Sequence, residues 1–135
     1  MSRPSEQPGW PPRDPGPTAW VFPDPRDAPP GEAVVAIGAD LEPGTLVRAY
    51  STGLFPMHLS DGSLGWWSPD PRGFLPLGGM RMTRSLRASA RHFTVTFNQA
   101  FDAVVQGCAA DRPDRWITDD IRLAYNRLHR LGWAH

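Results

Sequence analysis

Apolar residues recur every three or four positions in four stretches of this 135-residue chain, which is the spacing of one helix face. The first stretch predicts a helix over residues 43–52, with Pro43 suited to its first turn and Gly53 to its end. The second stretch follows Thr83, a good N-cap residue, and predicts a helix over residues 84–91. Its side chains expected to face inward are Leu86 and Ala90.

Two more helices are predicted towards the end of the chain. Asn98 is expected to cap the first of them. Its apolar side carries Phe101, Val104, Val105 and Cys108. We expect Cys108 to be a small buried residue. Thr118 and the acidic pair Asp119–Asp120 favour the start of the last helix, and Gly132 its end. Its apolar stripe consists of Ile121, Ala124, Tyr125, Leu128 and Leu131.

Strand patterns are shorter and fewer. Three apolar residues alternate with two threonines over residues 93–97, which predicts a half-buried strand. Residues 33–38 form an apolar run that fits a strand or a loose buried turn, and residues 73–77 fit a short strand or an extended run. Asp61-Gly62 is a turn signal. The chain is therefore predicted to be α+β, although strand 93–97 has no evident partner in the sequence.

A stiff segment, Trp66-Trp67-Ser68-Pro69-Asp70-Pro71-Arg72, follows that turn. Consecutive side chains of an extended backbone point to opposite sides, so Trp66 and Trp67 can serve two surfaces, such as a core and a pocket. The prolines restrict the backbone, and Arg72 offers a forked donor for a carboxylate or a phosphate. The alternative is a structural corner, with the tryptophans in a core and Asp70 and Arg72 as a local brace.

Composition restricts the kinds of ligand, cofactor and location that the chain can have. The net charge is zero, and all 14 basic residues are arginine, which suits bidentate phosphate contacts. Ten of the 16 prolines lie in residues 1–30, so we predict that residues 1–19 are a disordered tail. One cysteine excludes an internal disulfide, and we find no metal-ligand spacing and no glycine-rich nucleotide loop. No signal peptide or membrane-spanning run is evident. We therefore expect no metal, no cofactor and no membrane association.

Two polar groupings could carry function. Arg84, Arg87 and Arg91 are spaced to line one helix face, which could follow a nucleic-acid backbone or be an ordinary solvated face. Tyr125 and His129 are four residues apart, so they could face one site, although a tyrosine packed in the core and a surface histidine is the simpler interpretation. The sequence contains no nucleophile–base arrangement, and we assign no catalytic residue within it.

Several blocks of the chain, in their order and spacing, closely resemble the leucyl/phenylalanyl-tRNA–protein transferase family. The blocks are Phe22-Pro23-Asp24-Pro25, Ile37-Gly38-Ala39-Asp40-Leu41, Ala49-Tyr50-Ser51-Thr52-Gly53-Leu54-Phe55-Pro56, the double-tryptophan segment, Arg84-Ser85, Asn98-Gln99-Ala100-Phe101, Gly107-Cys108-Ala109, Trp116-Ile117-Thr118 and Ala124-Tyr125-Asn126-Arg127-Leu128-His129. The resemblance covers residues from about 20 to 135. It implies a cytoplasmic, monomeric enzyme that moves Leu or Phe from Leu-tRNA or Phe-tRNA to proteins with an N-terminal Arg or Lys. The added residue marks those proteins for degradation.

The resemblance also implies a domain organisation. Residues 20–68 are similar to the family's small N-terminal α/β domain, and residues 69–135 to the start of its GNAT-like acyltransferase domain. The family's chain continues past the stretch ending at His135, and the polar groups credited with catalysis come after it. This sequence is therefore expected to be an incomplete transferase that is inactive alone. The alternatives are a truncated paralogue that binds tRNA or a protein without catalysis, and the product of a decayed gene.

The family's adenosine- and aminoacyl-binding positions transfer to particular residues of this chain. The resemblance assigns this role to Tyr50, Met57, Trp66, Trp67 and Trp116. Some relatives carry tryptophan where this chain has Met57, and a methionine can line an apolar pocket but cannot stack as a plane. The resemblance assigns tRNA binding to the arginine row, Arg84, Arg87 and Arg91.

Overall fold

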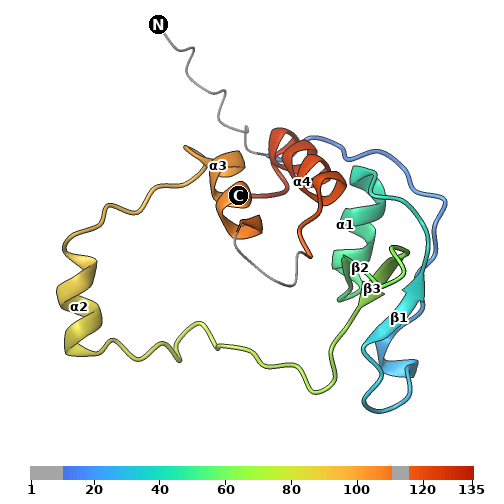
Figure 1. The fold of residues 1–135 in the computed structure, drawn as a ribbon, viewed down its shortest axis with the longest axis horizontal. Helices are drawn as coiled ribbons and strands as arrows, with labels where there is room; N and C mark the ends of the chain where they lie inside the picture. Colours follow the sequence, from blue (N-terminus) through green and yellow to red (C-terminus); the bar gives the residue numbers. More distant parts are fainter. Residues whose placement is uncertain (1–10, 111–115) are drawn as a thin grey trace, which may run out of the picture.

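The computed structural model describes residues 11–110 and 116–135. A small three-stranded sheet and three packed helices form its main body, and a long excursion carries a further helix (Figure 1). The elements in chain order are a 3-10 helix η1 (Pro25–Asp27), β1 (Val34–Ile37), α1 (Pro43–Ser51), β2 (Phe55–His58), β3 (Leu64–Trp67), α2 (Arg84–Ala90), α3 (Phe101–Ala109) and α4 (Asp119–Leu131). The α+β class predicted from the sequence is confirmed.

The sheet is antiparallel throughout and has the order β1-β3-β2. Strands β2 and β3 form a hairpin in which Phe55 pairs with Trp67 and His58 with Leu64. The predicted Asp61-Gly62 turn closes it. Gly62 has a φ of +85°, and the Asp61 carboxylate accepts a bond from the backbone of the residue two positions on. The apolar run at residues 33–38, predicted as a strand or a buried turn, contains strand β1. It forms a strand because β3 pairs with it.

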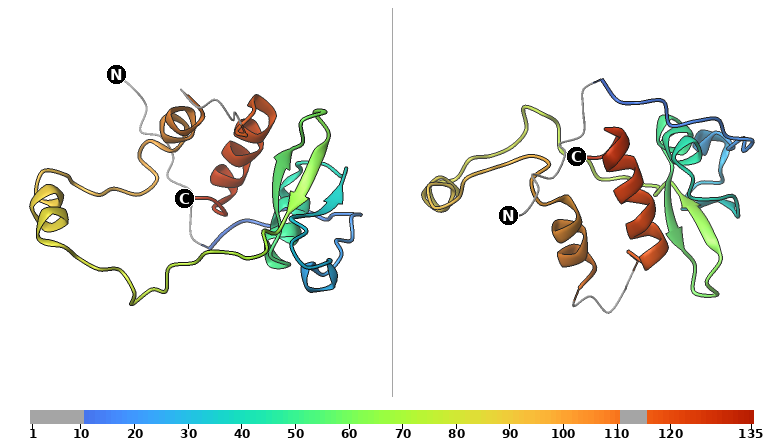
Figure 2. Two further views of the ribbon diagram at one scale, coloured as in Figure 1. Left: turned by 60° about the horizontal axis from the view of Figure 1, so that its bottom comes forward. Right: turned by 90° about the horizontal axis from the view of Figure 1, so that it is seen from above.

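The hydrophobic core joins the sheet to α1 and α4. Its buried side chains are Leu46, Ala49, Leu54, Trp66, Ala124 and Leu128, with Ile121 also buried. Figure 2 shows α4 between α3 on one side and α1 with the sheet on the other. The core therefore extends across residue 68, where the sequence predicted a domain boundary. Among the described residues, no helix is long and apolar enough to cross a membrane.

The two adjacent tryptophans occupy different environments. Trp66 is fully buried, donates from Nε1 to the carbonyl of Gly38 at 2.8 Å, and meets the Phe22 ring edge-on at 4.7 Å. Trp67 is only half-buried and donates from Nε1 to the carbonyl of Met57 at 2.8 Å. The opposed orientation predicted from strand geometry holds.

The corner after β3 also makes local contacts. Asp70 Oδ2 accepts a bond from the backbone N–H of Gly31 at 3.1 Å. Arg72 donates to the carbonyl of Gly53 at 3.2 Å and lies 5.7 Å from the centre of the Phe55 ring. Asp70 and Arg72 therefore brace the corner, as the sequence analysis gave as the alternative to a binding role. In this structure the Arg72 guanidinium donates to a backbone carbonyl.

Residues 11–19 run extended alongside α4 and α1, which differs from the disordered tail predicted for residues 1–19. The backbone N–H of Arg13 donates to the carbonyl of Leu131 at 2.8 Å, and Trp133 Nε1 donates to the Arg13 carbonyl at 2.7 Å. Thr18 and Thr45 share a hydroxyl hydrogen bond of 2.8 Å. A proline-rich segment gains few bonds from its own backbone, so these contacts with helices distant in sequence position it. Residues 1–10 of the predicted tail lie outside the described residues.

Residues 73–97, which we call the arm, leave β3, carry α2 and return to α3 (Figures 1 and 2). The strand predicted over 93–97 is wrong for this structure, because no described strand lies beside it to complete its hydrogen bonds. Residues 73–77 do not form the short strand, and residue 77 lies in a turn. Thr83 caps α2 as predicted, with its hydroxyl accepting from the N–H of Leu86, yet Leu86 is exposed rather than inward. Helix α2 buries no residue because no described element packs against it.

Two further predictions around α3 are wrong. Asn98 does not cap the helix, since the N-cap is Ala100 and Asn98 has a φ of +61°, a left-handed conformation that asparagine tolerates well. Cys108 is exposed rather than buried. The reason is that α4 covers only one side of α3, so the helix has an apolar face without the second neighbour needed to bury it.

Candidate functional site

A cavity of about 640 Å³ opens between α3, α4 and the end of α1. Its lining is mainly apolar and includes six side chains of phenylalanine, tyrosine and tryptophan, which are Tyr50, Phe97, Phe101, Trp116, Tyr125 and Trp133. These residues come from α1, the end of the arm, α3, α4 and the segments on either side of α4, so only the folded chain gathers them. An aromatic cavity of this kind suits a ligand with a flat ring or an apolar side chain.

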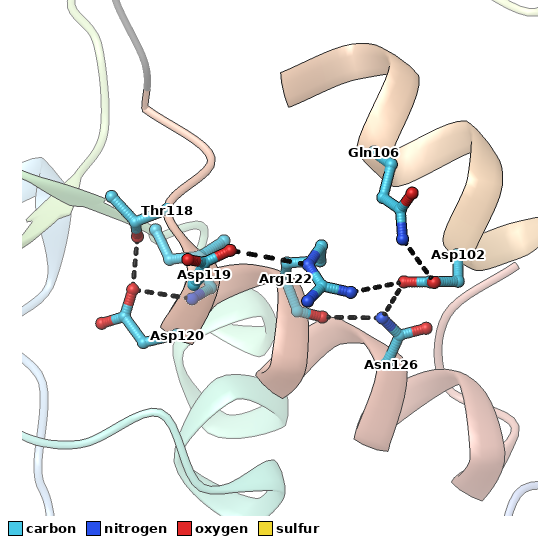
Figure 3. Close-up of polar contacts among 8 residues, drawn as sticks. Asp102, Gln106, Thr118, Asp119, Asp120, Arg122 and Asn126 are labelled. Atoms are coloured by element: carbon cyan, nitrogen blue, oxygen red, sulfur yellow. Dashed lines mark hydrogen bonds and ion pairs between the residues drawn. The ribbon is translucent and has the colours of Figure 1, made fainter. Parts of the chain in front are cut away.

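A polar network fixes the two helices that form the cavity walls (Figure 3). The carboxylate of Asp102 on α3 accepts bonds from Asn126 Nδ2 at 2.7 Å and from Arg122 Nη1 at 3.0 Å, both on α4. Gln106, one turn along α3, donates to the same carboxylate at 2.8 Å. Arg122 also lies 3.8 Å from Asp119. One carboxylate thus ties α3 to α4 with charge-assisted bonds.

The Asp102 network predicts an acid-sensitive helix contact. Hydrogen bonds from Asn126 and then Arg122 hold the pKa of Asp102 below its usual value of 3.8. The stability this carboxylate contributes is therefore present above the unfolded-state pKa and is lost as the pH falls through the lower folded-state value. We expect α3 amides to lose hydrogen-exchange protection below a pH of about 3.8. Asp102→Asn should remove that acid step.

The matched control for this experiment is Asp119→Asn, because the Asp119 side chain is 95% exposed and its ion pair is long. We expect Asp119→Asn to keep the acid step of the parent protein. An acid transition of unchanged amplitude and midpoint in Asp102→Asn would contradict the assignment of that step to this carboxylate.

The start of α4 is anchored to β2, and this anchor positions Trp116 at the cavity. His58 Nε2 lies 3.2 Å from Asp120 Oδ2, and His58 Nδ1 lies 3.3 Å from the Thr118 hydroxyl. Asp120 also accepts bonds from the Thr118 hydroxyl and from the N–H of Ile121, the latter at 2.9 Å. Trp116 is two residues before this cluster and is partly exposed at the cavity, a location set by the anchored turn.

Two tyrosine hydroxyls meet at the cavity. Tyr50 from α1 and Tyr125 from α4 share a hydrogen bond, and their rings lie edge to face with centroids 6.4 Å apart. Burial, together with the adjacent Tyr50 hydroxyl, raises the pKa of Tyr125 well above its usual range. The Tyr125 hydroxyl is therefore protonated at neutral pH and remains a hydrogen-bond donor.

Two histidines, His129 and His135, contact residues that line the cavity. The rings of Phe101 and His129 stack in parallel, with centroids 4.1 Å apart and an interplanar angle of 2°. His129 Nδ1 lies 2.7 Å from the carbonyl of Ala134, which requires that this nitrogen carry the proton and donate it. Asn98 and His135 contact each other at 3.1 Å at the cavity rim. His129 thus fixes Phe101 in the wall but does not itself line the cavity.

The structure brings together only two of the five residues assigned to aminoacyl or adenosine binding. Tyr50 and Trp116 both line the cavity. Trp66 lies in the core, and Trp67 and Met57 are joined to each other in the sheet. These three residues do not line the cavity.

The three arginines assigned to tRNA lie on the arm at α2 (Figure 1), and none of them lines the cavity. Arg84 and Arg87 belong to α2, and Arg91 is its C-cap. All three are exposed, and within the described residues none of them forms an ion pair. Their guanidinium groups are therefore accessible to an anionic ligand.

Several cavity residues had no predicted role in binding. Phe101 and Trp133 were not assigned to a site, and Tyr125 was left open between a core position and a site shared with His129. The available signal was the position of Trp133 directly after Gly132, the residue that caps the end of α4. In the described ranges, no group of three or more histidine, cysteine or acidic side chains is placed to hold a metal ion.

The fold and the cavity define a small α+β protein with an aromatic cavity. Comparison with known families gives two matches. Residues 39–70 match the model described as leucyl/phenylalanyl-tRNA protein transferase N-terminal domain, and residues 74–135 match the model described as leucyl/phenylalanyl-tRNA protein transferase. Together these models account for more than half of the chain, which belongs to the leucyl/phenylalanyl-tRNA protein transferase family.

Curated relatives agree with the family models. The chain is 46% identical over 121 residues to the leucyl/phenylalanyl-tRNA--protein transferase of Alcanivorax borkumensis, which covers 84% of this chain and 50% of the relative. It is 44% identical over 130 residues to the protein of the same name from Anaeromyxobacter dehalogenans, covering 92% of this chain and 53% of the relative. The chain thus spans about half the length of the curated relatives it matches.

Proposed function

We propose that this chain provides the aminoacyl-end binding site of an aminoacyltransferase that moves Leu or Phe from Leu-tRNA or Phe-tRNA to the N-terminal Arg or Lys of a protein. The product would be a protein marked for degradation, and the reaction would take place in the cytoplasm. In this proposal the chain acts as a single copy, and residues 69–135 open a GNAT-like acyltransferase domain. Family membership supports the reaction class, and the cavity supports the role of this chain within it.

The observation that carries the proposal is the meeting of Tyr50 and Trp116 in one aromatic cavity. An amino acid esterified to a terminal adenosine presents a flat base and, for Leu or Phe, an apolar side chain. Aromatic faces bind both groups, and base stacking on an aromatic side chain contributes about 1–3 kcal/mol without reading sequence. The cavity volume of about 640 Å³ lies in the range typical of small-molecule sites.

The chemistry required is amide formation from an ester. The neutral α-amine of the acceptor protein attacks the ester carbonyl carbon, the carbon–oxygen bond to the ribose breaks, and the tRNA hydroxyl leaves with the proton lost by the amine. Binding must hold the ester still and meet its oxygen atoms with donors. Tyrosine hydroxyls are protonated at neutral pH, so the hydrogen-bonded hydroxyls of Tyr50 and Tyr125 offer a donor at the cavity. In this proposal it positions the ester and takes no proton.

The arginine row supplies the proposed contact with the tRNA backbone. Arg84, Arg87 and Arg91 are exposed, and guanidinium groups bind phosphate oxygens in a bidentate manner. Binding through several phosphates releases counterions, so the affinity for tRNA should fall steeply with salt concentration. The cavity contact with the aminoacyl group should depend on salt much less.

The test of the cavity uses a hydrolysis-resistant 3′-amide analogue of phenylalanyl-adenosine. We expect Trp116→Ala to weaken its binding by about 5- to 150-fold, the equivalent of the roughly 1–3 kcal/mol contributed by stacking. Titration calorimetry on the parent and the variant measures the two dissociation constants. The mutation removes one aromatic wall and leaves the core residues in place, since Trp116 is 37% exposed.

The matched control is Trp20→Ala, because Trp20 is exposed and lies outside the cavity. It should leave the dissociation constant of the analogue unchanged within about twofold. Equal affinities of the parent and Trp116→Ala for the analogue would refute the cavity as the aminoacyl site. Tight binding of Phe-tRNA without transfer to an Arg-initiated peptide, even when the second half of a relative is supplied, would favour the non-catalytic tRNA-binding alternative.

A further inference from the structure

Residues 11–19, which we call the strap, join the C-terminal end of α4 to the N-terminal end of α1. At α4, the backbone N–H of Arg13 donates to the carbonyl of Leu131 at 2.8 Å, and its guanidinium donates to the carbonyl of Arg130 at 2.6 Å. These carbonyls belong to the last turn of the helix, where no later helical N–H reaches them, and a cation is favourable there. The strap therefore caps α4 from a position 117 residues away in sequence.

Trp133 connects the strap to the cavity. Its indole Nε1 donates to the carbonyl of Arg13 at 2.7 Å, and the same side chain lines the cavity. Its backbone N–H donates to the carbonyl of Leu128 at 2.9 Å, so α4 itself fixes the backbone at this position. The side chain is 42% exposed, and among the described residues the Arg13 carbonyl is the hydrogen-bond partner of its indole. Because packing covers only part of this ring, the bond to the strap is what fixes its orientation at the cavity.

Gly44, in the first turn of α1, allows the strap to lie directly against that helix. A Cβ at this position would lie 2.3 Å from the carbonyl oxygen of Gly16 and 2.7 Å from that of Pro17, both far shorter than a van der Waals contact. The φ of Gly44 lies outside the left-handed region, so the close approach of the strap, and not the helix backbone, requires glycine here. Beside it, Thr18 of the strap and Thr45 of α1 share a hydroxyl hydrogen bond of 2.8 Å.

We propose that the strap is a positioning element of the cavity, in which the Arg13 carbonyl holds Trp133 as a preformed wall. Arg13 and Gly44 are then positioning residues, because neither lines the cavity and both act through Trp133. Pro15 and Pro17 stiffen the strap between its contact with Gly44 and Arg13, so a displacement at α1 is passed on to the Trp133 bond. A wall that is ordered beforehand does not have to be ordered by the ligand, which raises the affinity. The inference rests on the proposed function, since it takes the cavity as the aminoacyl site.

Gly44→Ala in the whole chain tests the proposal. The added Cβ pushes the strap away from α1, so we expect hydrogen exchange of the Trp133 indole N–H to become at least about tenfold faster. Nitrogen-15 NMR resolves the indole N–H signals, and the loss of one signal in Trp133→Phe identifies that of Trp133. We also expect the dissociation constant of the phenylalanyl-adenosine analogue to rise about 2- to 12-fold, the range for a side chain that must be ordered on binding.

The matched control is Gly107→Ala, which makes the same change inside α3. A Cβ at Gly107 would meet no atom within 4 Å, and Gly107 does not line the cavity. We expect this variant to keep both the indole exchange rate of Trp133 and the dissociation constant of the analogue within about twofold of the parent.

A second variant, Arg13→Ala, removes the guanidinium bond to the carbonyl of Arg130 without adding bulk. We expect it to speed exchange of the Trp133 indole about 2- to 12-fold, the equivalent of one net hydrogen bond. Arg13→Lys keeps a cationic donor at the end of α4, so its exchange rate should stay closer to that of the parent. Arg13 is exposed, so its substitution leaves the core intact, and Arg13→Ala decides the question if Gly44→Ala does not fold.

Two outcomes would overturn the proposal: an unchanged exchange rate of the Trp133 indole in a folded Gly44→Ala, or faster exchange with the analogue affinity of the parent. The readouts separate this inference from the proposed function, because indole exchange is measured without ligand and Trp116→Ala tests the cavity directly. Failure of the parent to bind the analogue would refute the assigned ligand. Faster indole exchange in Gly44→Ala and Arg13→Ala would even then identify the strap as the segment that positions Trp133.

Discussion

Trp66→Ala is expected to lower the free energy of unfolding by about 3–5 kcal/mol, the usual cost of truncating a large buried aromatic side chain to alanine. Trp66 has no exposed surface, and it packs among side chains from α1, α4 and the sheet. Its Nε1 also donates to the carbonyl of Gly38, so the mutation removes a donor from a buried carbonyl as well as creating a cavity. Urea unfolding followed by far-UV circular dichroism measures the loss.

The control for Trp66→Ala is the same substitution at an exposed tryptophan. Trp20→Ala loses an exposed ring and its hydrogen bond to Asp40, and we expect a cost of about 1 kcal/mol or less. If Trp66→Ala and Trp20→Ala unfold at the same urea concentration, Trp66 does not occupy the core position described here. It would then be available for the ligand-binding role that the family resemblance assigned to it.

The second prediction tests whether α4 belongs to the same core as the sheet. Leu128→Ala should cost about 2–5 kcal/mol, because Leu128 is 3% exposed and packs in the cluster with Leu46, Leu54 and Trp66. Unfolding should remain one transition for the sheet and for α4, since one shared core links them. Tryptophan fluorescence and hydrogen exchange of α4 amides report on the two parts separately.

Leu123→Ala is the matched control on the same helix, because Leu123 is 57% exposed. We expect it to change the free energy of unfolding by no more than about 0.5 kcal/mol. Separate transitions for α4 and the sheet in the parent, or equal costs for Leu128→Ala and Leu123→Ala, would contradict a core that spans residue 68. They would favour two units divided at the boundary predicted from the sequence.

Local signals in the sequence were sufficient to predict where the helices lie. Helix α1 begins at Pro43 and ends just before Gly53, α2 is capped by Thr83, and α4 ends at Gly132 in the left-handed conformation. Each of these signals acts within one turn of the helix end, so it can be recognised without the rest of the fold. The buried stripe of α4 was predicted by periodicity for the same reason.

The absence of a strand at residues 93–97 and the exposure of Cys108 could not be predicted in this way. The pattern at residues 93–97 is that of a strand, but a strand forms only where a neighbour completes its hydrogen bonds, and none of the described strands lies there. Cys108 lies on an apolar helix face, yet it is exposed because α4 covers only one side of α3. In both cases the outcome depends on a partner that the local sequence does not contain.

By itself the sequence determined the α+β class, the helices with the ends of α1, α2 and α4, and the resemblance to a family that the comparisons then established, because all three follow from the order and spacing of residues along the chain. Only the tertiary structure decided the composition of the cavity. Tyr50 and Tyr125 are 75 positions apart and meet because α1 and α4 pack on one core, while Trp66 and Met57 are held in the sheet. Which aromatic residues share a site depends on helix packing over long sequence separations, and no local pattern encodes that distance.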